Sequence, residues 1–267
     1  ALSAAFYCLG VRRLWQKAGT GRVVSARQVA AFAVGIVALA IALVSPLEAL
    51  SGVLFSAHMV QHLLLILVAA PLMALGAQPA IWLWALPRRR RRPLARWWRR
   101  QQPLHIAWRA LSAPFAVWLL HTGAVWIWHV PALYEAALAS EAIHTLEHLT
   151  FFGTALLFWW VLLGRTTQGA TRYLTGMALA AGTAFHGSLL GVLMTFAPAP
   201  WYASYAATAA PWGLTPLEDQ QLAGVIMWVP AGTVYVVVLL ALLGVWLRTL
   251  EEQDRMSGHA PARQGTG

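Results

Sequence analysis

Long apolar runs, separated by short polar segments, dominate the chain. Most of these runs hold about 18 or more residues, enough for one helix to cross a hydrocarbon core of about 30 Å. In a bilayer only helices and closed barrels satisfy their own backbone groups, and the runs are continuous rather than alternating, which favours helices. The predicted full spans cover about residues 28–44, 58–75, 111–128, 143–163, 173–195 and 222–247.

The remaining segments complete the predicted architecture. Residues 1–11 would extend only about 16 Å as a helix, so we interpret them as the second half of a span whose start is missing. Residues 131–140 suit a short interfacial helix, and the proline- and aromatic-rich residues 198–216 suit a loop on the membrane surface. We therefore predict an all-α polytopic membrane bundle of about seven spans, the first truncated. It forms one domain over residues 1–250, followed by a polar tail over 251–267.

Composition supports this class, and the positions of the charges add an orientation. Of 267 residues, 59% are apolar and only 10% are charged, whereas a soluble domain has about 25% charged residues. The net charge of +10 could suggest nucleic acid, but all 19 lysines and arginines fall in alternate loops. By the positive-inside rule these loops are cytoplasmic, which places the amino end outside and the carboxyl tail inside. We expect membrane lipid, and no nucleic acid, as a partner.

Histidines gather on the opposite side from the basic loops. His105 and His259 fall on the cytoplasmic side, and the other seven fall in the outer half: His58, His62, His121, His129, His144, His148 and His186. Two pairs are spaced four residues apart at the outer starts of two predicted spans, so each pair shares one helix face. A third predicted helix carries His186, and the remaining two histidines bracket the outer end of a fourth.

These seven histidines are the candidate metal ligands. Imidazole suits copper, zinc, iron and nickel, and ionisable residues in a membrane usually face the bundle interior or a cavity. A single histidine near a span end is most often an interfacial or hydrogen-bonded residue, but two pairs at matching depth favour a metal or cofactor. Met59, Met194 and Met227 could add thioethers, which favour Cu(I). Six acidic residues on the same side could orient imidazoles or attract cations: Glu48, Glu135, Glu141, Glu147, Glu218 and Asp219.

One local pattern suggests zinc instead. His144-Thr-Leu-Glu147-His148 fits the inverted zinc-peptidase pattern H-x-x-E-H, in which two imidazoles bind zinc and the glutamate activates water. Five residues with two free positions make a weak signal, and the pair His58 and His62 has no glutamate between its members. We therefore keep zinc, and an intramembrane peptidase, as minor alternatives.

Four stretches in order resemble the multi-pass CtaG family of cytochrome c oxidase assembly factors. They are Ser56-Ala-His58-Met59-Val-Gln61-His62 with Ala70-Pro71-Leu72 and Gly76; Trp128-His129-Val-Pro131-Ala-Leu-Tyr134; His144-Thr-Leu-Glu147-His148; and Pro216-Leu-Glu218-Asp219-Gln220-Gln221 with Met227-Trp228. The resemblance covers almost the whole chain. Each stretch alone is a modest match to the family, and the occurrence of all four in the same order makes the resemblance specific.

The resemblance implies a seven-helix protein of the bacterial plasma membrane that helps to assemble haem-copper oxidase. It also implies copper as the metal and the oxidase subunits as partners. The expected function is to hold copper and pass it to the oxidase catalytic subunit by ligand exchange, without enzymatic turnover and without catalytic residues. Two alternatives stay open, a haem-binding protein with axial imidazoles from two helices, and a copper transporter. A transporter would need ligands at several depths, whereas the sequence clusters them at one.

Overall fold

The computed structural model describes residues 2–163 and 171–258, which form helices joined by loops, without strands. Five helical runs are long and apolar enough to cross a membrane: α2 (Ala26–Val44), Phe55–Gly76, α11 (Glu141–Leu162), α12 (Thr171–Thr195) and α13 (Pro216–Gly258). The pair α8 (Gln102–Leu111) and α9 (Pro114–Trp128), bent by 64°, gives a sixth if it forms one span. The all-helical, multi-span prediction is confirmed, while seven spans and the orientation stay predictions.

The two terminal helices extend beyond the predicted spans. Helix α1 (Leu2–Ala18) continues through the first basic residues and packs on α6 (Pro79–Ala85), and its Tyr7 hydroxyl donates to the Gly76 carbonyl at 3.0 Å. At the other end, α13 continues to Gly258, well past the predicted boundary of the tail. Residues 259–267 of that tail, including His259, lie outside the described residues.

The span Phe55–Gly76 is not a regular α-helix along its whole length. It consists of α4 (Phe55–Leu63), the π-helix η1 (Leu64–Ala69) and α5 (Ala70–Gly76). Pro71 has no N–H for the Leu67 carbonyl, and its ring would collide with a regular preceding turn, which the wider π turns relieve. The Ile66 carbonyl accepts from Trp159 Nε1 at 2.7 Å. π turns are frequent at functional sites, and this one directly follows His62.

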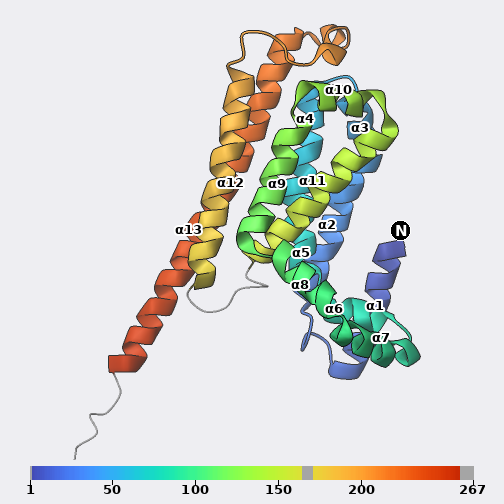
Figure 1. Cartoon of the computed structure of the whole chain (residues 1–267), viewed down its shortest axis with the longest axis vertical. Coiled ribbons are helices and arrows are strands. Elements are labelled where there is room, and N and C mark those ends of the chain that lie inside the picture. The colour runs from blue at the N-terminus through green and yellow to red at the C-terminus, as the bar shows by residue number, and fades with distance from the viewer. Residues whose placement is uncertain (1, 164–170, 259–267) are drawn as a thin grey trace, which may run out of the picture.

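The two ends of the bundle differ in chemistry. Figure 1 shows α3 (Pro46–Ser51), α4 and α10 (Pro131–Ala139) at one end, with α6, α7 (Arg88–Arg100) and α8 at the other. The arginine-rich helix and the histidine-bearing helix starts therefore lie at opposite ends. The predicted short helix over residues 131–140 is confirmed as α10.

The segment between α12 and α13 closes the histidine end. It contains the short 3-10 helices η2 (Ala203–Tyr205) and η3 (Ala210–Trp212), but it also buries two tyrosines in the bundle. Tyr202 packs on Phe55 with ring centroids 4.8 Å apart, and Tyr205 shares a 2.9 Å hydrogen bond with Tyr134. Burial raises the pKa of both loop phenols, so they act as neutral hydrogen-bonding groups.

Candidate metal centre

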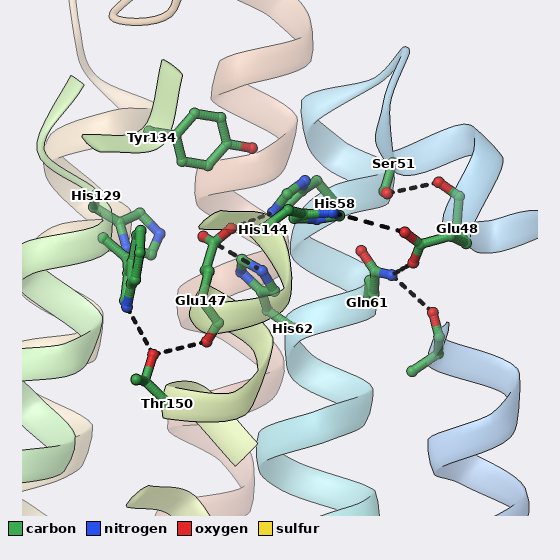
Figure 2. Close-up of polar contacts among 12 residues, drawn as sticks. Glu48, Ser51, His58, Gln61, His62, His129, Tyr134, His144, Glu147 and Thr150 are labelled. Atoms are coloured by element: carbon green, nitrogen blue, oxygen red, sulfur yellow. Dashed lines mark hydrogen bonds and ion pairs between the residues drawn. The ribbon is translucent and has the colours of Figure 1, made fainter. Parts of the chain in front are cut away.

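Four histidines meet between α4 and α11. His58 and His62 project from α4 toward His144 and His148 of α11, as Figure 2 shows for the first three. The ring centroids of His58 and His144 are 5.4 Å apart, and those of His62 and His148 are 5.5 Å apart. Each pair shares one helix face because its members are four residues apart. The fold turns those two faces toward each other.

Glu147 lies within this group. One carboxylate oxygen is 3.8 Å from His58 Nε2, and the other is 3.7 Å from His62 Nε2. Both distances exceed those of hydrogen bonds. We call His58, His62, His144, Glu147 and His148 the histidine cluster. Its carboxylate, like the side chains of His58 and His62, is almost completely buried.

The buried ring nitrogens and carboxylate oxygens of the histidine cluster lack hydrogen-bond partners. Within the part of the chain that the structure describes, this holds for both ring nitrogens of His58 and of His62 and for both Glu147 oxygens. The Nε2 atoms of His144 and His148 also lack hydrogen-bond partners. Burying unpaired polar groups costs free energy, and most native proteins avoid it. Lone pairs that converge in this way fit a shared cation.

Two overlapping sets of three groups have the spacing of a metal site. One consists of His58, His144 and His148, the other of His58, His62 and Glu147, and in each set one ligand atom per residue lies within 4.8 Å of the others. Two ligands about 2.0–2.1 Å from one ion lie about 3–4 Å apart, so small side-chain movements would close either set. Imidazole with one carboxylate suits copper or zinc. His58 belongs to both sets.

A carboxylate and an amide connect the histidine cluster to the exterior. Glu48, on α3, has a 39% exposed side chain and lies 3.8 Å from His144 Nδ1. Gln61 Nε2 donates to the Ala42 carbonyl at 2.8 Å and also contacts the Glu48 carboxylate (Figure 2). Sequence reasoning singled out Glu48 but missed Gln61, whose signal was an amide in an apolar span beside His62. Glu48 thus offers a cation a first contact near the surface.

Asp219 fixes the start of the α4 helix from a distant part of the chain. Its fully buried carboxylate accepts from the backbone N–H groups of Phe55 at 2.7 Å and Ser56 at 3.1 Å. Leu54, the residue before α4, makes no side-chain cap, so Asp219 supplies the missing acceptor. A carboxylate at a helix amino end is also favoured by the helix dipole. Asp219 therefore positions the helix that carries His58 and His62.

Other acidic residues proposed from the sequence are placed away from the imidazoles. Glu218 caps its own helix, with its carboxylate accepting from Thr215 N at 2.8 Å, and Glu135 binds the Ser204 backbone at 3.1 Å. Glu141 is exposed in the first turn of α11. Within the described chain, Glu48 and Glu147 are the acids whose carboxylates lie within 4 Å of a histidine nitrogen. Those two are the acids that can act on a bound ion.

The other predicted ligands lie outside both three-residue sets. His129 directly follows α9 and lies at the edge of the histidine cluster. His121 and His186 lie deeper, in α9 and α12, and all three histidines line an internal cavity. Met59 and Met227 line the same cavity, whereas Met194 is packed in the apolar core. His105 is on α8, at the opposite end, where its Nε2 lies 2.9 Å from the Trp98 carbonyl oxygen.

Comparison with known proteins assigns the family. The family described as cytochrome c oxidase caa3 assembly factor matches residues 5–249, nearly the whole chain. The chain belongs to this family. The sequence resemblance to the CtaG family is thereby confirmed, and the matched segment includes the entire histidine cluster.

The curated relatives share low sequence identity with this chain, and each is much longer than it. An uncharacterised protein of Mycobacterium leprae is 26% identical over 243 residues, which cover 89% of this chain and 36% of the relative. Uncharacterised proteins of Mycobacterium bovis and Mycobacterium tuberculosis are each 26% identical over 229 residues, covering 84% of this chain and 34% of theirs. The chain thus spans about a third of the length of these relatives. No solved structure matches it.

Proposed function

We propose that this assembly factor binds copper in the histidine cluster and passes it to the catalytic subunit of cytochrome c oxidase. The observation that carries the proposal is the convergence of unpaired, buried imidazole nitrogens and carboxylate oxygens from α4 and α11. Copper is the cargo of the protein, and transfer by ligand exchange needs no catalytic turnover. Copper suits the donor set because imidazole is a preferred ligand for it.

The two overlapping ligand sets supply a route for exchange. An ion that arrives near the partly exposed Glu48 would first meet His144, and then the set of His58, His144 and His148. Because His58 also belongs to the set with His62 and Glu147, the ion can change ligands while one bond to His58 is retained. Stepwise exchange avoids returning the ion to water. The arrangement therefore suits a transient carrier more than a permanent structural site.

Packing around the histidine cluster favours an ion over haem. The Tyr134 ring lies 5.2 Å from His58 and the Phe151 ring 4.5 Å from His62, measured between centroids. These aromatic rings fill the space that a macrocycle between two axial imidazoles would need. A zinc peptidase would need its glutamate free to activate water, whereas Glu147 lies within a ligand set. Copper carriage is accordingly the function that we adopt.

Metal analysis of the purified protein tests copper binding. The wild type should retain copper, and a His62→Ala/His148→Ala double variant should retain less copper per chain, because each ligand set of the histidine cluster then loses one imidazole. His105, on α8 at the opposite end of the molecule, supplies a control variant, His105→Ala, which should bind copper like the wild type. A reduced-minus-oxidised spectrum of the same samples should lack a Soret band. A Soret band that is present in the wild type and lost in the double variant would show that these histidines bind haem instead of copper.

We further propose that the histidine end faces outward, because the arginine-rich α7 lies at the other end. In a Cys8→Ser background, a cysteine placed at exposed Arg90 should react with an impermeant thiol reagent only from the cytoplasmic side. A cysteine at Ala207, in the exposed part of the segment between α12 and α13, should react only from outside. Labelling of both positions from one side would refute this orientation.

A further inference from the structure

A second group of metal-binding side chains lies beyond His62, away from Glu48. These side chains line an internal cavity of about 50 Å³ bounded by α4, α9, α11, α12 and α13. One water needs only about 10–15 Å³ by the same measure, so this volume has room for one ion and a small number of waters. The donors that line it are His62, His121, His129, His186, Met59 and Met227. We call this space the inner cavity.

Hydrogen bonds fix the tautomers of two of these histidines. Thr154 Oγ1 donates to the Thr150 carbonyl at 2.7 Å, so toward His121 Nδ1, 3.1 Å away, it can only accept. Nδ1 of His121 therefore carries the proton and its Nε2 carries the lone pair. His129 Nδ1 likewise donates to the Val125 carbonyl at 2.6 Å, which leaves its Nε2 unprotonated. A histidine that ligates a metal through one ring nitrogen usually donates the N–H of the other to such a partner, so both histidines are prepared to bind a metal through Nε2.

His186 faces these two histidines from another helix without any partner of its own. Its side chain is 7% exposed, and neither ring nitrogen has a hydrogen bond to any described residue. Its ring centroid lies 6.0 Å from that of Trp118, one turn before His121 on α9. A buried imidazole with two unpaired nitrogens is costly, and most such groups are satisfied in native proteins. The thioethers of Met59 and Met227 favour Cu(I) among the ions that could satisfy it.

His62 connects the two groups of donors. It belongs to the ligand set with His58 and Glu147, and it also lines the inner cavity. His121 and His186 lie seven and nine residues from the ends of their helices at the histidine end, or about 10–14 Å along the helix. The donors therefore form a series of increasing depth, from Glu48 through the histidine cluster to the inner cavity.

We propose that the inner cavity is a second Cu(I)-binding position, with Nε2 of His121 and a ring nitrogen of His186 as ligands. Copper reaches it from the histidine cluster through His62. This inference deepens the proposed function and depends on it for the metal that is supplied. It also gives the bundle ligands at a second depth, which the sequence did not indicate.

The series of donors ends at this depth. His121 contacts Phe158, with ring centroids 5.4 Å apart, and beyond it the core consists of apolar and aromatic side chains. Tyr235 lines the cavity and stacks on Trp159, with centroids 5.8 Å apart. An ion could not continue through this layer without losing its ligands. The inner cavity is thus an end position within the membrane, which suits transfer to a neighbouring membrane protein more than passage across the bilayer.

Copper stoichiometry tests the second position. Purified full-length protein, wild type and variants, is saturated anaerobically with Cu(I), separated from excess metal and analysed for copper per chain. We expect two copper ions in the wild type and one in a His121→Ala/His186→Ala variant. A His58→Ala/His144→Ala variant should also bind one, now in the inner cavity. His105→Ala is the matched control and should bind two.

The pattern of losses separates the two proposals. If the wild type binds one ion, which the His58→Ala/His144→Ala variant loses and the His121→Ala/His186→Ala variant keeps, the inner position is wrong and the histidine cluster stands. If the single ion is instead lost from the His121→Ala/His186→Ala variant and kept by the His58→Ala/His144→Ala variant, the histidine cluster is not a copper site and the inner position stands. Unchanged copper in both variants would refute both. Where an alanine variant aggregates, His186→Gln, which keeps a polar side chain of similar size, should show the same loss of one ion.

Discussion

Replacing His58 with alanine should leave cells with oxidase that lacks copper. His58 belongs to both ligand sets of the histidine cluster, so its loss leaves neither set complete. Changes to residues that only support a metal ligand cost about 10–100-fold in metal affinity, so losing a shared ligand should cost more than about 100-fold. The measurement is copper per haem in oxidase purified from a bacterial host in which the variant replaces its own family member. We expect a decrease of at least about tenfold.

The variant should still fold, because apolar spans rather than the metal site hold the bundle in the bilayer. Its amount in the membrane should therefore match the wild type. His105, on α8 at the opposite end of the molecule, provides the control: His105→Ala should support normal copper content in the oxidase. If His58→Ala reduces only the amount of protein while copper per folded molecule is unchanged, the histidines are structural. Copper carriage would then be supported by family membership alone.

Changing Glu147 to glutamine should have opposite effects on copper affinity and on stability. The substitution keeps the shape of the side chain but removes a charge from the set with His58 and His62, so copper affinity should fall by at least about tenfold. In the metal-free protein, the buried carboxylate has no hydrogen-bond partner among the described residues. Its removal should raise the stability of the metal-free protein by about 1–3 kcal/mol. Copper competition and thermal unfolding in detergent measure the two effects.

A structural ion pair would behave in the opposite way. If Glu147 paired with protonated His58 or His62, removing its charge would leave an uncompensated buried cation and destabilise the metal-free protein by about 3–5 kcal/mol. A lower melting temperature with unchanged copper affinity would therefore contradict its role as a ligand. Glu135→Gln supplies a matched control, because Glu135 is only partly buried and contacts the backbone of Ser204 instead of a histidine. It should change copper affinity little.

The sequence alone determined the features that depend on local periodicity. Continuous apolar runs predicted the helical spans, since a bilayer leaves the backbone few alternatives. The i,i+4 spacing of His58 with His62, and of His144 with His148, placed each pair on one face, because an α-helix has 3.6 residues per turn. Helix α10 was predictable from a short apolar segment between two polar ones. The six acids were recognised as a group, but their separate roles were not.

Only the tertiary structure decided which faces meet, because contacts between distant segments leave no periodic signal. It turned Glu147 toward His58 and His62 and placed Asp219 on the start of α4, 164 residues from Phe55 in the chain. The spacing of eight between His121 and His129 places them about two turns apart, yet packing of α9 against α12 brings both to the inner cavity with His186. Helical spacing fixes where a side chain points on its own helix, and packing alone fixes what it points toward.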